Sequence, residues 1–162
     1  MREVVVFSGS AHEPLAHRIC DELGVELSQT ALSRFSNDCL QAQLLANCRQ
    51  RDVYIVQPLV PPTQDSLMEL LLMIDAARGA SASMITAVIP HYAYARSDKK
   101  DASRISLGGR LVADLISTAG ADRVLIAVQA VLLDHLPRHR HHVGHGEDVE
   151  EVVVRLFQLE AD

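Results

Sequence analysis

The segment EVVVFSGSAHEPLAHRICDELG, residues 3–24, decides the fold class because its hydrophobic period changes at a tight turn. Its β-branched run EVVVFS is typical of a buried strand, and the Gly/Ser turn that follows ends that strand. Leu15, Ile19 and Leu23 then recur at helical spacing, and Gly24 is the residue type that commonly ends a helix. A strand, a tight turn and a helix in this order predict the first part of a βαβ unit.

Two pairs of residues have the spacing of a capping box, in which a Ser side chain starts a helix and a Glu three residues later closes the first turn. Ser10 and Glu13 form the first pair, with Pro14 beside them in the predicted first turn. Ser66 and Glu69 form the second pair. We therefore expect both pairs to cap helices.

The rest of the chain repeats the alternation of strand and helix. Strands are predicted at 25–35 and 39–46 around a turn at 36–38, and at 52–57, 83–90 and 122–128; helices are predicted at 66–79 and 106–120. The helix at 66–79 is apolar nearly all round, which predicts burial against a sheet or a partner subunit. Leu107, Leu111 and Leu115 are in register along the helix at 106–120. The alternation predicts an α/β fold with a mostly parallel sheet and helices on both faces.

Length and composition indicate one domain. A chain of 162 residues with 48% hydrophobic and 22% charged residues suits a single globular domain. The net charge of −6 argues against bulk binding to nucleic acid or to an anionic membrane, so we expect no nucleic-acid partner and no membrane partner. The start of the sequence lacks the apolar core of a signal peptide, and Cys20, Cys39 and Cys48 have no metal-site spacing. We expect reduced thiols and a cytoplasmic protein.

An unusual concentration of cations occurs in YARSDKKDASRIS, residues 94–106. Lys99 and Lys100 are the only lysines of the chain, and Arg96 and Arg104 flank them. Arg provides a planar fork for a base or for phosphate oxygens, and Lys provides a compact charge, so the loop suits a polyphosphate. The interleaved aspartates could hold the cations in place, bind a ribose hydroxyl or touch Mg²⁺. A solvated loop of mixed charge explains the same residues.

Other features leave alternatives open. The turn at 8–10 could bind phosphate through backbone N–H groups or be an ordinary capped turn. His91 and Tyr92 could line a nucleotide pocket or simply pack. A histidine-rich run could bind a transition metal or be solvent-exposed: His139, Arg140, His141, His142 and His145. No pattern indicates a Ser-His-Asp or Cys-His nucleophile.

Several segments together resemble the ribose-phosphate pyrophosphokinase (phosphoribosyl pyrophosphate synthetase) family, from about residue 3 to about residue 127. They are FSGSAHEPLAHRICDELG, RFSND, DVYIVQP, LMELLLMIDAARGASASMITAVIPHYAYARSDKKD and GADRVL. The resemblance implies a phosphoribosyltransferase-like (Rossmann-like) three-layer domain over 1–128. Residues 129–162 would then be a divergent His-rich tail with a terminal helix, packed on the same domain. The reaction of the family transfers a pyrophosphoryl group from Mg·ATP to the anomeric hydroxyl of ribose 5-phosphate.

The resemblance also implies site residues and partners. The nucleotide-binding positions it implies, for ATP or ADP with Mg²⁺, are Phe35, Asn37, Arg96, Ser97, Asp98, Lys99, Lys100 and Asp101. The positions implied for a regulatory phosphate are Arg49, Ser81, Lys100, Ser103 and Arg104. In the family, the segment that matches Phe35 and Asn37 reaches in from an adjacent subunit, which implies a homo-oligomer or assembly with a full-length synthetase subunit.

The chain departs from the family pattern at several positions. Cys39 stands where the family usually has a glutamate that accepts from adenine, and Ser97 replaces a glutamine. After the last strand the family reads Asp-Leu-His, whereas this chain reads Val128, Gln129, Ala130. Because neither Val nor Ala can bind a metal or transfer a proton, we expect no direct protein ligand to Mg²⁺ and no catalytic residue there.

The sequence also contains no acidic, glycine-containing loop of the kind that holds ribose 5-phosphate in the second half of the family's chain. Phosphoryl-type transfer depends on positioning and charge neutralisation, so we expect the isolated chain to be a poor catalyst. Two functions follow as expectations: a divergent ribose-phosphate diphosphokinase, or a non-catalytic nucleotide- or phosphate-binding domain that regulates a full-length synthetase.

Overall fold

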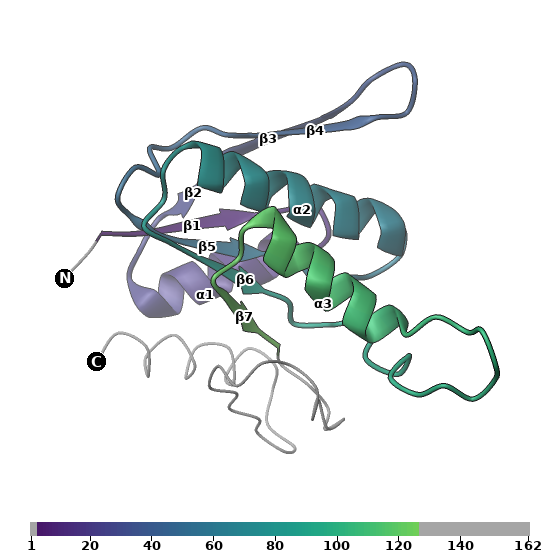
Figure 1. Ribbon diagram of the computed structural model, residues 1–162. Helices are drawn as coiled ribbons and strands as arrows, with labels where there is room; N and C mark the ends of the chain where they lie inside the picture. The colour runs from purple at the N-terminus through teal and green to yellow at the C-terminus, as the bar shows by residue number, and fades with distance from the viewer. Residues whose placement is uncertain (1–2, 127–162) are drawn as a thin grey trace.

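A computed structural model describes residues 3–126 of the chain and shows a parallel five-stranded sheet (Figure 1). The order across the sheet is β2 (Leu27–Ser28), β1 (Val4–Ser8), β5 (Asp52–Val56), β6 (Met84–Val88) and β7 (Arg123–Leu125). All four pairings in this sheet are parallel. The central strands β1 and β5 are short runs rich in β-branched residues, as predicted, which suits strands that are covered on both faces.

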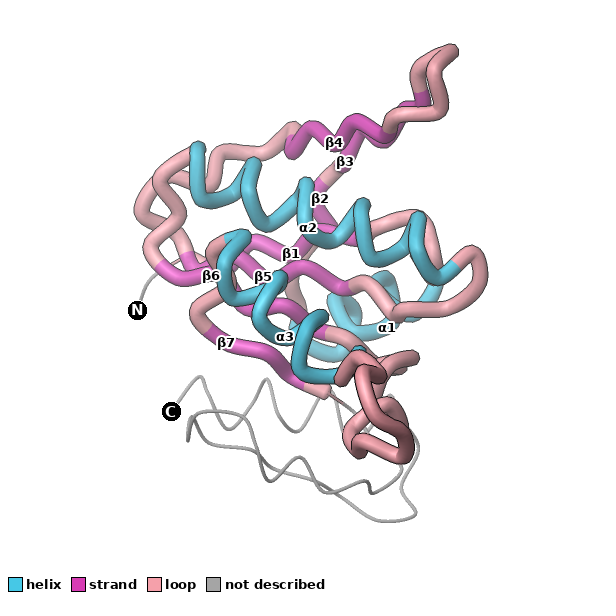
Figure 2. Tube along the Cα trace, turned by 45° about the vertical axis from the view of Figure 1, so that its right-hand side comes forward, coloured by secondary structure: helices cyan, strands magenta, loops and turns pink. Residues whose placement is uncertain are grey.

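Helices cover both faces of the sheet, which confirms the predicted α/β class (Figures 1 and 2). The helices are α1 (Glu13–Leu23), α2 (Thr63–Gly79) and α3 (Gly108–Ala119). One core cluster joins α2 and α3 to alternate strand residues such as Phe7 and Ile55, which are fully buried. A second cluster joins α1 to the residues of the opposite face, such as Val6 and Val56.

A separate antiparallel hairpin, β3 (Thr30–Arg34) and β4 (Leu40–Leu44), confirms the predicted pairing around a turn at 36–38. The single strand predicted at 25–35 is wrong, because its first part is β2, which pairs with β1 in the main sheet. Helix α2 packs against it, because Leu32, Ala42 and Leu44 join the core cluster that α2 shares with the sheet. The position of α2 between these elements explains why this helix is apolar nearly all round. It contacts the sheet on one side, the hairpin on another and α3 on a third.

The two predicted capping boxes are wrong. Helix α1 is capped instead by His12, whose Nδ1 accepts from the Leu15 N–H at 3.1 Å. Helix α2 starts after Pro62 with no side-chain cap. Ser10 and Glu69, one member of each expected pair, bind each other. The Glu69 carboxylate accepts from the Ser10 N–H at 3.1 Å and from its hydroxyl at 2.8 Å.

Gln57 completes this buried polar network. Its Nε2 donates to Glu69 at 2.9 Å and to the Ser66 carbonyl at 3.2 Å, and its Oε1 accepts from the Ala11 N–H at 3.3 Å. Gln57 is fully buried and Glu69 is only 7% exposed. Ser10 and Gln57 therefore fix the turn after β1 to Glu69 of α2. The Ser10 hydroxyl and the Glu69 carboxylate, each expected to cap its own helix, are satisfied by this long-range contact instead.

The His-rich run, the predicted terminal helix and Val128–Ala130 lie outside the residues that the structure describes. Within 3–126, no helix is long and apolar enough to span a membrane.

Candidate nucleotide site

The cationic loop at 94–106 lies between β6 and α3, at the edge of the sheet where the parallel strands end (Figure 2). Backbone hydrogen bonds continue the sheet at this edge: Gly9 donates to Val56, and Gln57 donates to Val88. The turn after β1 and the loops after β5 and β6 therefore meet at one edge. Ligands of open parallel sheets bind at such an edge.

Two side chains fix the base of the loop to the start of α3. The Tyr92 hydroxyl donates to the Gly109 carbonyl at 2.6 Å, and the Ser97 hydroxyl accepts from the Gly108 N–H at 3.0 Å. Tyr92 is 6% exposed, and burial raises the pKa of its phenol above the ordinary value, so the hydroxyl stays protonated and can donate. Tyr92 therefore packs, whereas His91 is exposed.

The approach of the loop to α3 requires glycine. A Cβ on Gly109 would lie 2.9 Å from the Tyr94 carbonyl oxygen, and a Cβ on Gly108 would lie 3.0 Å from the Ser97 hydroxyl. The sequence SLGG thus allows the backbone of the helix start and the backbone of the loop to come into contact.

The cations of the loop are exposed. Arg96, Lys99, Lys100 and Arg104 are all exposed, and no ion pair joins any of them to a carboxylate among residues 3–126. The interleaved aspartates therefore do not neutralise them by direct pairing. Four cations without a direct carboxylate partner at a ligand-binding edge are chemically suited to an anion with several negative charges.

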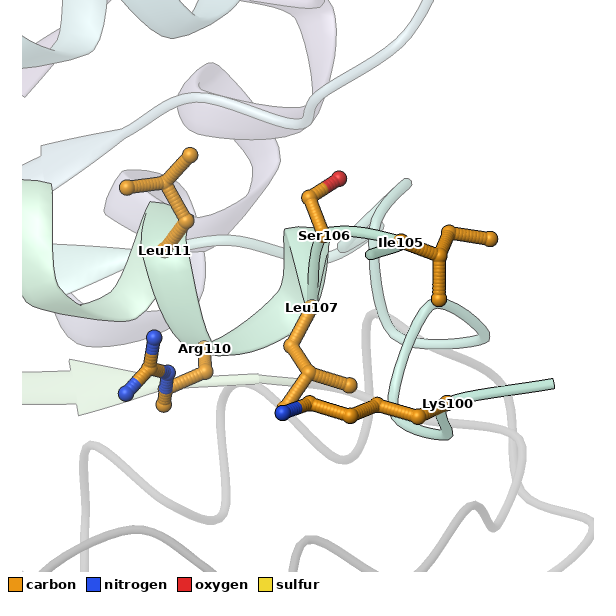
Figure 3. Close-up of a pocket in the computed structure, with 6 residues that line it drawn as sticks. All are labelled: Lys100, Ile105, Ser106, Leu107, Arg110 and Leu111. Carbon is orange, nitrogen blue, oxygen red and sulfur yellow. The ribbon is translucent and has the colours of Figure 1, made fainter. Parts of the chain in front are cut away.

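A pocket of about 240 Å³ lies where the loop meets the first turn of α3 (Figure 3). It is lined by Lys100, Ile105, Ser106, Leu107, Arg110 and Leu111. Sequence reasoning missed Arg110, because a cation in a predicted amphipathic helix is normally a solvated residue of the outer face. Val112 and Ile116 form the buried face of α3, whereas Leu111 and Leu115, expected to be in register, are 50% and 41% exposed.

The structure does not bring Phe35 and Asn37 to the loop. Both are exposed at the tip of the β3–β4 hairpin, which extends away from the cationic loop in both views (Figures 1 and 2). Arg34 orients the hairpin, because its guanidinium donates to Asp38 within the hairpin and to Asp65 of α2, each at 2.6 Å. Within one copy of the chain, the side chains of Phe35 and Asn37 therefore lie apart from the cationic loop (Figures 1 and 2).

The residues expected to bind a regulatory phosphate fall into two groups. Arg49 and Ser81 precede β5 and β6, and the turns that carry them are joined by a bond from the Gln50 N–H to the Ser81 carbonyl at 2.9 Å. Lys100, with Ser103 and Arg104, lies beyond the opposite ends of the same strands. Within one copy of the chain, these two groups do not share a pocket.

No group of three or more His, Cys, Asp or Glu side chains within 3–126 could hold a metal ion. Cys20 and Cys48 are buried, and Cys39 is exposed at the hairpin tip.

The fold and the loop together define a class: an α/β domain with an exposed cationic loop at the carboxyl ends of the strands of a parallel sheet. A family model for the N-terminal domain of ribose phosphate pyrophosphokinase matches residues 4–120. The chain belongs to this family.

Named relatives agree. A Streptomyces coelicolor protein provisionally named a ribose-phosphate pyrophosphokinase is 60% identical over 154 residues, which is 90% of this chain and 49% of that protein. The ribose-phosphate pyrophosphokinase of Deinococcus radiodurans is 57% identical over 122 residues, 75% of this chain and 38% of that protein. The chain therefore spans about half the length, or less, of these relatives.

A solved structure also agrees with the fold. The crystal structure of phosphoribosylpyrophosphate synthetase from Mycobacterium smegmatis superposes with a TM-score of 0.76 at 38% identity. The superposition covers 78% of this chain and 43% of that one.

Proposed function

We propose that the chain binds Mg·ATP through the loop at 94–106 and supplies this nucleotide site for pyrophosphoryl transfer to ribose 5-phosphate. The main supporting observation is the set of exposed cations without ion-pair partners in 3–126, at the carboxyl edge of the sheet. Relatives named ribose-phosphate pyrophosphokinase support the choice of reaction.

Five residues of the loop have a proposed task. Arg96 stacks on the adenine, and Lys99 and Lys100 bind the phosphates. Asp98 and Asp101 contact the ribose hydroxyls or the water shell of Mg²⁺. Mg²⁺ arrives with ATP and takes its ligands mainly from phosphate oxygens and water, as this ion commonly does.

The proposed site is completed by a second copy of the chain. Phe35 and Asn37 of one copy contact the base bound at the loop of its neighbour, which makes the protein a homo-oligomer. The extended hairpin and the 53% exposure of Phe35 support this arrangement. A sedimentation experiment that finds only monomer at micromolar concentration would remove the shared site.

We propose that a second copy of the chain also completes the regulatory phosphate site. Arg49 and Ser81 of one copy would meet Lys100, Ser103 and Arg104 of another, because one copy places the two groups at opposite edges of the sheet.

A second candidate function is favoured by Val128 and Ala130, which stand where the family has Asp and His and can neither bind a metal nor transfer a proton. In that case the chain is a non-catalytic nucleotide- or phosphate-binding domain that regulates a full-length synthetase.

AMP formation separates the two candidates. The purified chain is incubated with Mg·ATP and ribose 5-phosphate, beside a Lys99→Ala/Lys100→Ala variant. Turnover that the variant loses supports the pyrophosphokinase, because the reaction then depends on the loop. Nucleotide binding without turnover supports the non-catalytic domain.

A further inference from the structure

Positive charge continues past the cationic loop into α3. Residues 96–110 contain Arg96, Lys99, Lys100, Arg104 and Arg110, which are five of the fifteen Lys and Arg residues of a chain with a net charge of −6. Only two acids, Asp98 and Asp101, lie in the same stretch. Such a local excess in an acidic protein requires a physical reason, since like charges held close together repel each other.

The pocket at the start of α3 places two of these cations against an apolar wall. Figure 3 shows Lys100 and Arg110 projecting on the same side of the helix start as the Leu107 side chain. No carboxylate is among the six residues that line the pocket. Asp114 follows Arg110 by one helical turn, yet no ion pair joins the two in the described part of the chain.

The apolar residues of the pocket are unusually open to solvent. Ile105 is 46% exposed and Leu111 is 50% exposed, although both are large and apolar. Two unpaired cations beside uncovered apolar side chains are the chemistry that recognises an anion carried on an organic group. The pocket, of about 240 Å³, is large enough for a phosphoryl group and the atoms next to it.

We propose that this pocket binds a phosphoryl group, with Lys100 and Arg110 as its charged contacts and Ile105, Leu107 and Leu111 as its wall. The phosphoryl group belongs either to the bound nucleotide or to free phosphate. If the phosphoryl group belongs to the bound nucleotide, the inference rests on the proposed function and adds Arg110 to the nucleotide site. If it belongs to free phosphate, the inference does not depend on nucleotide binding.

The test is a calorimetric titration of the full chain with inorganic phosphate and, separately, with Mg·ATP. Arg110→Gln removes the charge, and Arg110→Lys keeps it. Leu111→Ala shortens the wall, and Leu115→Ala is its matched control, because Leu115 is a similarly exposed leucine one turn further along α3 that does not line the pocket. Circular dichroism of each variant verifies the fold.

Arg110→Gln is expected to weaken binding of at least one of the two ligands about tenfold, since one charge-assisted contact is lost. Arg110→Lys should recover most of the affinity, Leu111→Ala should lose about threefold, and Leu115→Ala should lose none. If the pocket binds a phosphoryl group of the nucleotide, Arg110→Gln lowers the affinity for Mg·ATP. If it binds free phosphate, Arg110→Gln lowers the affinity for inorganic phosphate alone.

Unchanged affinity of Arg110→Gln for both ligands would overturn the inference. If Mg·ATP binding still fell in Lys99→Ala/Lys100→Ala, the proposed function would stand without it. Phosphate binding that depends on Arg110 in a chain without ATP affinity would support the pocket and overturn the nucleotide site. Binding of neither ligand to the wild-type chain would overturn both.

Discussion

The close contact between Gly9 and Gln57 predicts a large effect from a single methyl group. Gly9 follows β1 and is buried, and a Cβ added there would lie 2.2 Å from Gln57 Oε1 and 2.4 Å from Gln57 Cδ. Atoms do not approach this closely, so Gly9→Ala must displace the amide of Gln57. That amide is fully buried, so it cannot move into solvent.

The cost follows from the bonds that the amide makes. Gln57 donates to the Glu69 carboxylate at 2.9 Å and to the Ser66 carbonyl at 3.2 Å, and accepts from the Ala11 N–H at 3.3 Å. Losing one charge-assisted and up to two neutral bonds costs about 3–5 kcal/mol. This is a large share of the roughly 5–15 kcal/mol by which a domain is stable. It corresponds to a fall in melting temperature of about 10 °C.

Urea unfolding of the wild-type chain, Gly9→Ala and Gly79→Ala measures the effect. Gly79 is a matched control because it ends α2 with nothing within 4 Å of an added Cβ, so Ala there should be neutral or slightly stabilising. Gln57→Ala should remove the clash, so Gly9→Ala should cost little when added to it. A loss below about 0.5 kcal/mol in Gly9→Ala, or additive losses in the double variant, would refute the contact.

Three further predictions concern the thiols and the base of the loop. Burial, aided by the Asp21 charge, raises the pKa of the Cys20 thiol from 9.0 to about 11. Stability should therefore fall as pH rises from about 9 to 11, and urea unfolding should show a smaller fall in Cys20→Ala. One thiol should react rapidly with Ellman's reagent in the native chain, and Cys39→Ser should abolish that phase, because Cys20 and Cys48 are each only 2% exposed. Tyr92→Phe removes a buried bond to the start of α3 and should cost about 1 kcal/mol in urea unfolding, whereas an unchanged midpoint would contradict that bond.

The fold could be predicted because its signals are local. Each β-branched run and each helical repeat identifies its own element, and their alternation determines a parallel sheet without knowledge of any distant contact. The capping boxes failed for the opposite reason. Ser10 and Glu69 lie 59 residues apart in sequence, so local spacing contains no signal that they bind each other.

The candidate site was also predictable only where its signal is local in the sequence. The loop at 94–106 was visible as a concentration of cations after a strand, and the structure places it at the expected edge. Arg110 was not visible, because its place beside Lys100 depends on how the loop returns to α3 over Ser97 and the two glycines. The separation of Phe35 from the loop also depends on tertiary structure, namely on the hairpin that Arg34 ties to α2.

Titration of Mg·ATP into the full chain, beside Lys99→Ala/Lys100→Ala, tests the proposed nucleotide loop most directly. Both lysines are exposed and make no ion pair within 3–126, so the double variant should keep its fold, as circular dichroism would verify. Removing two charge-assisted contacts to phosphate is expected to weaken binding by more than tenfold. Equal affinity of the two proteins for Mg·ATP, or no binding to the wild-type chain, would contradict the assignment of the loop.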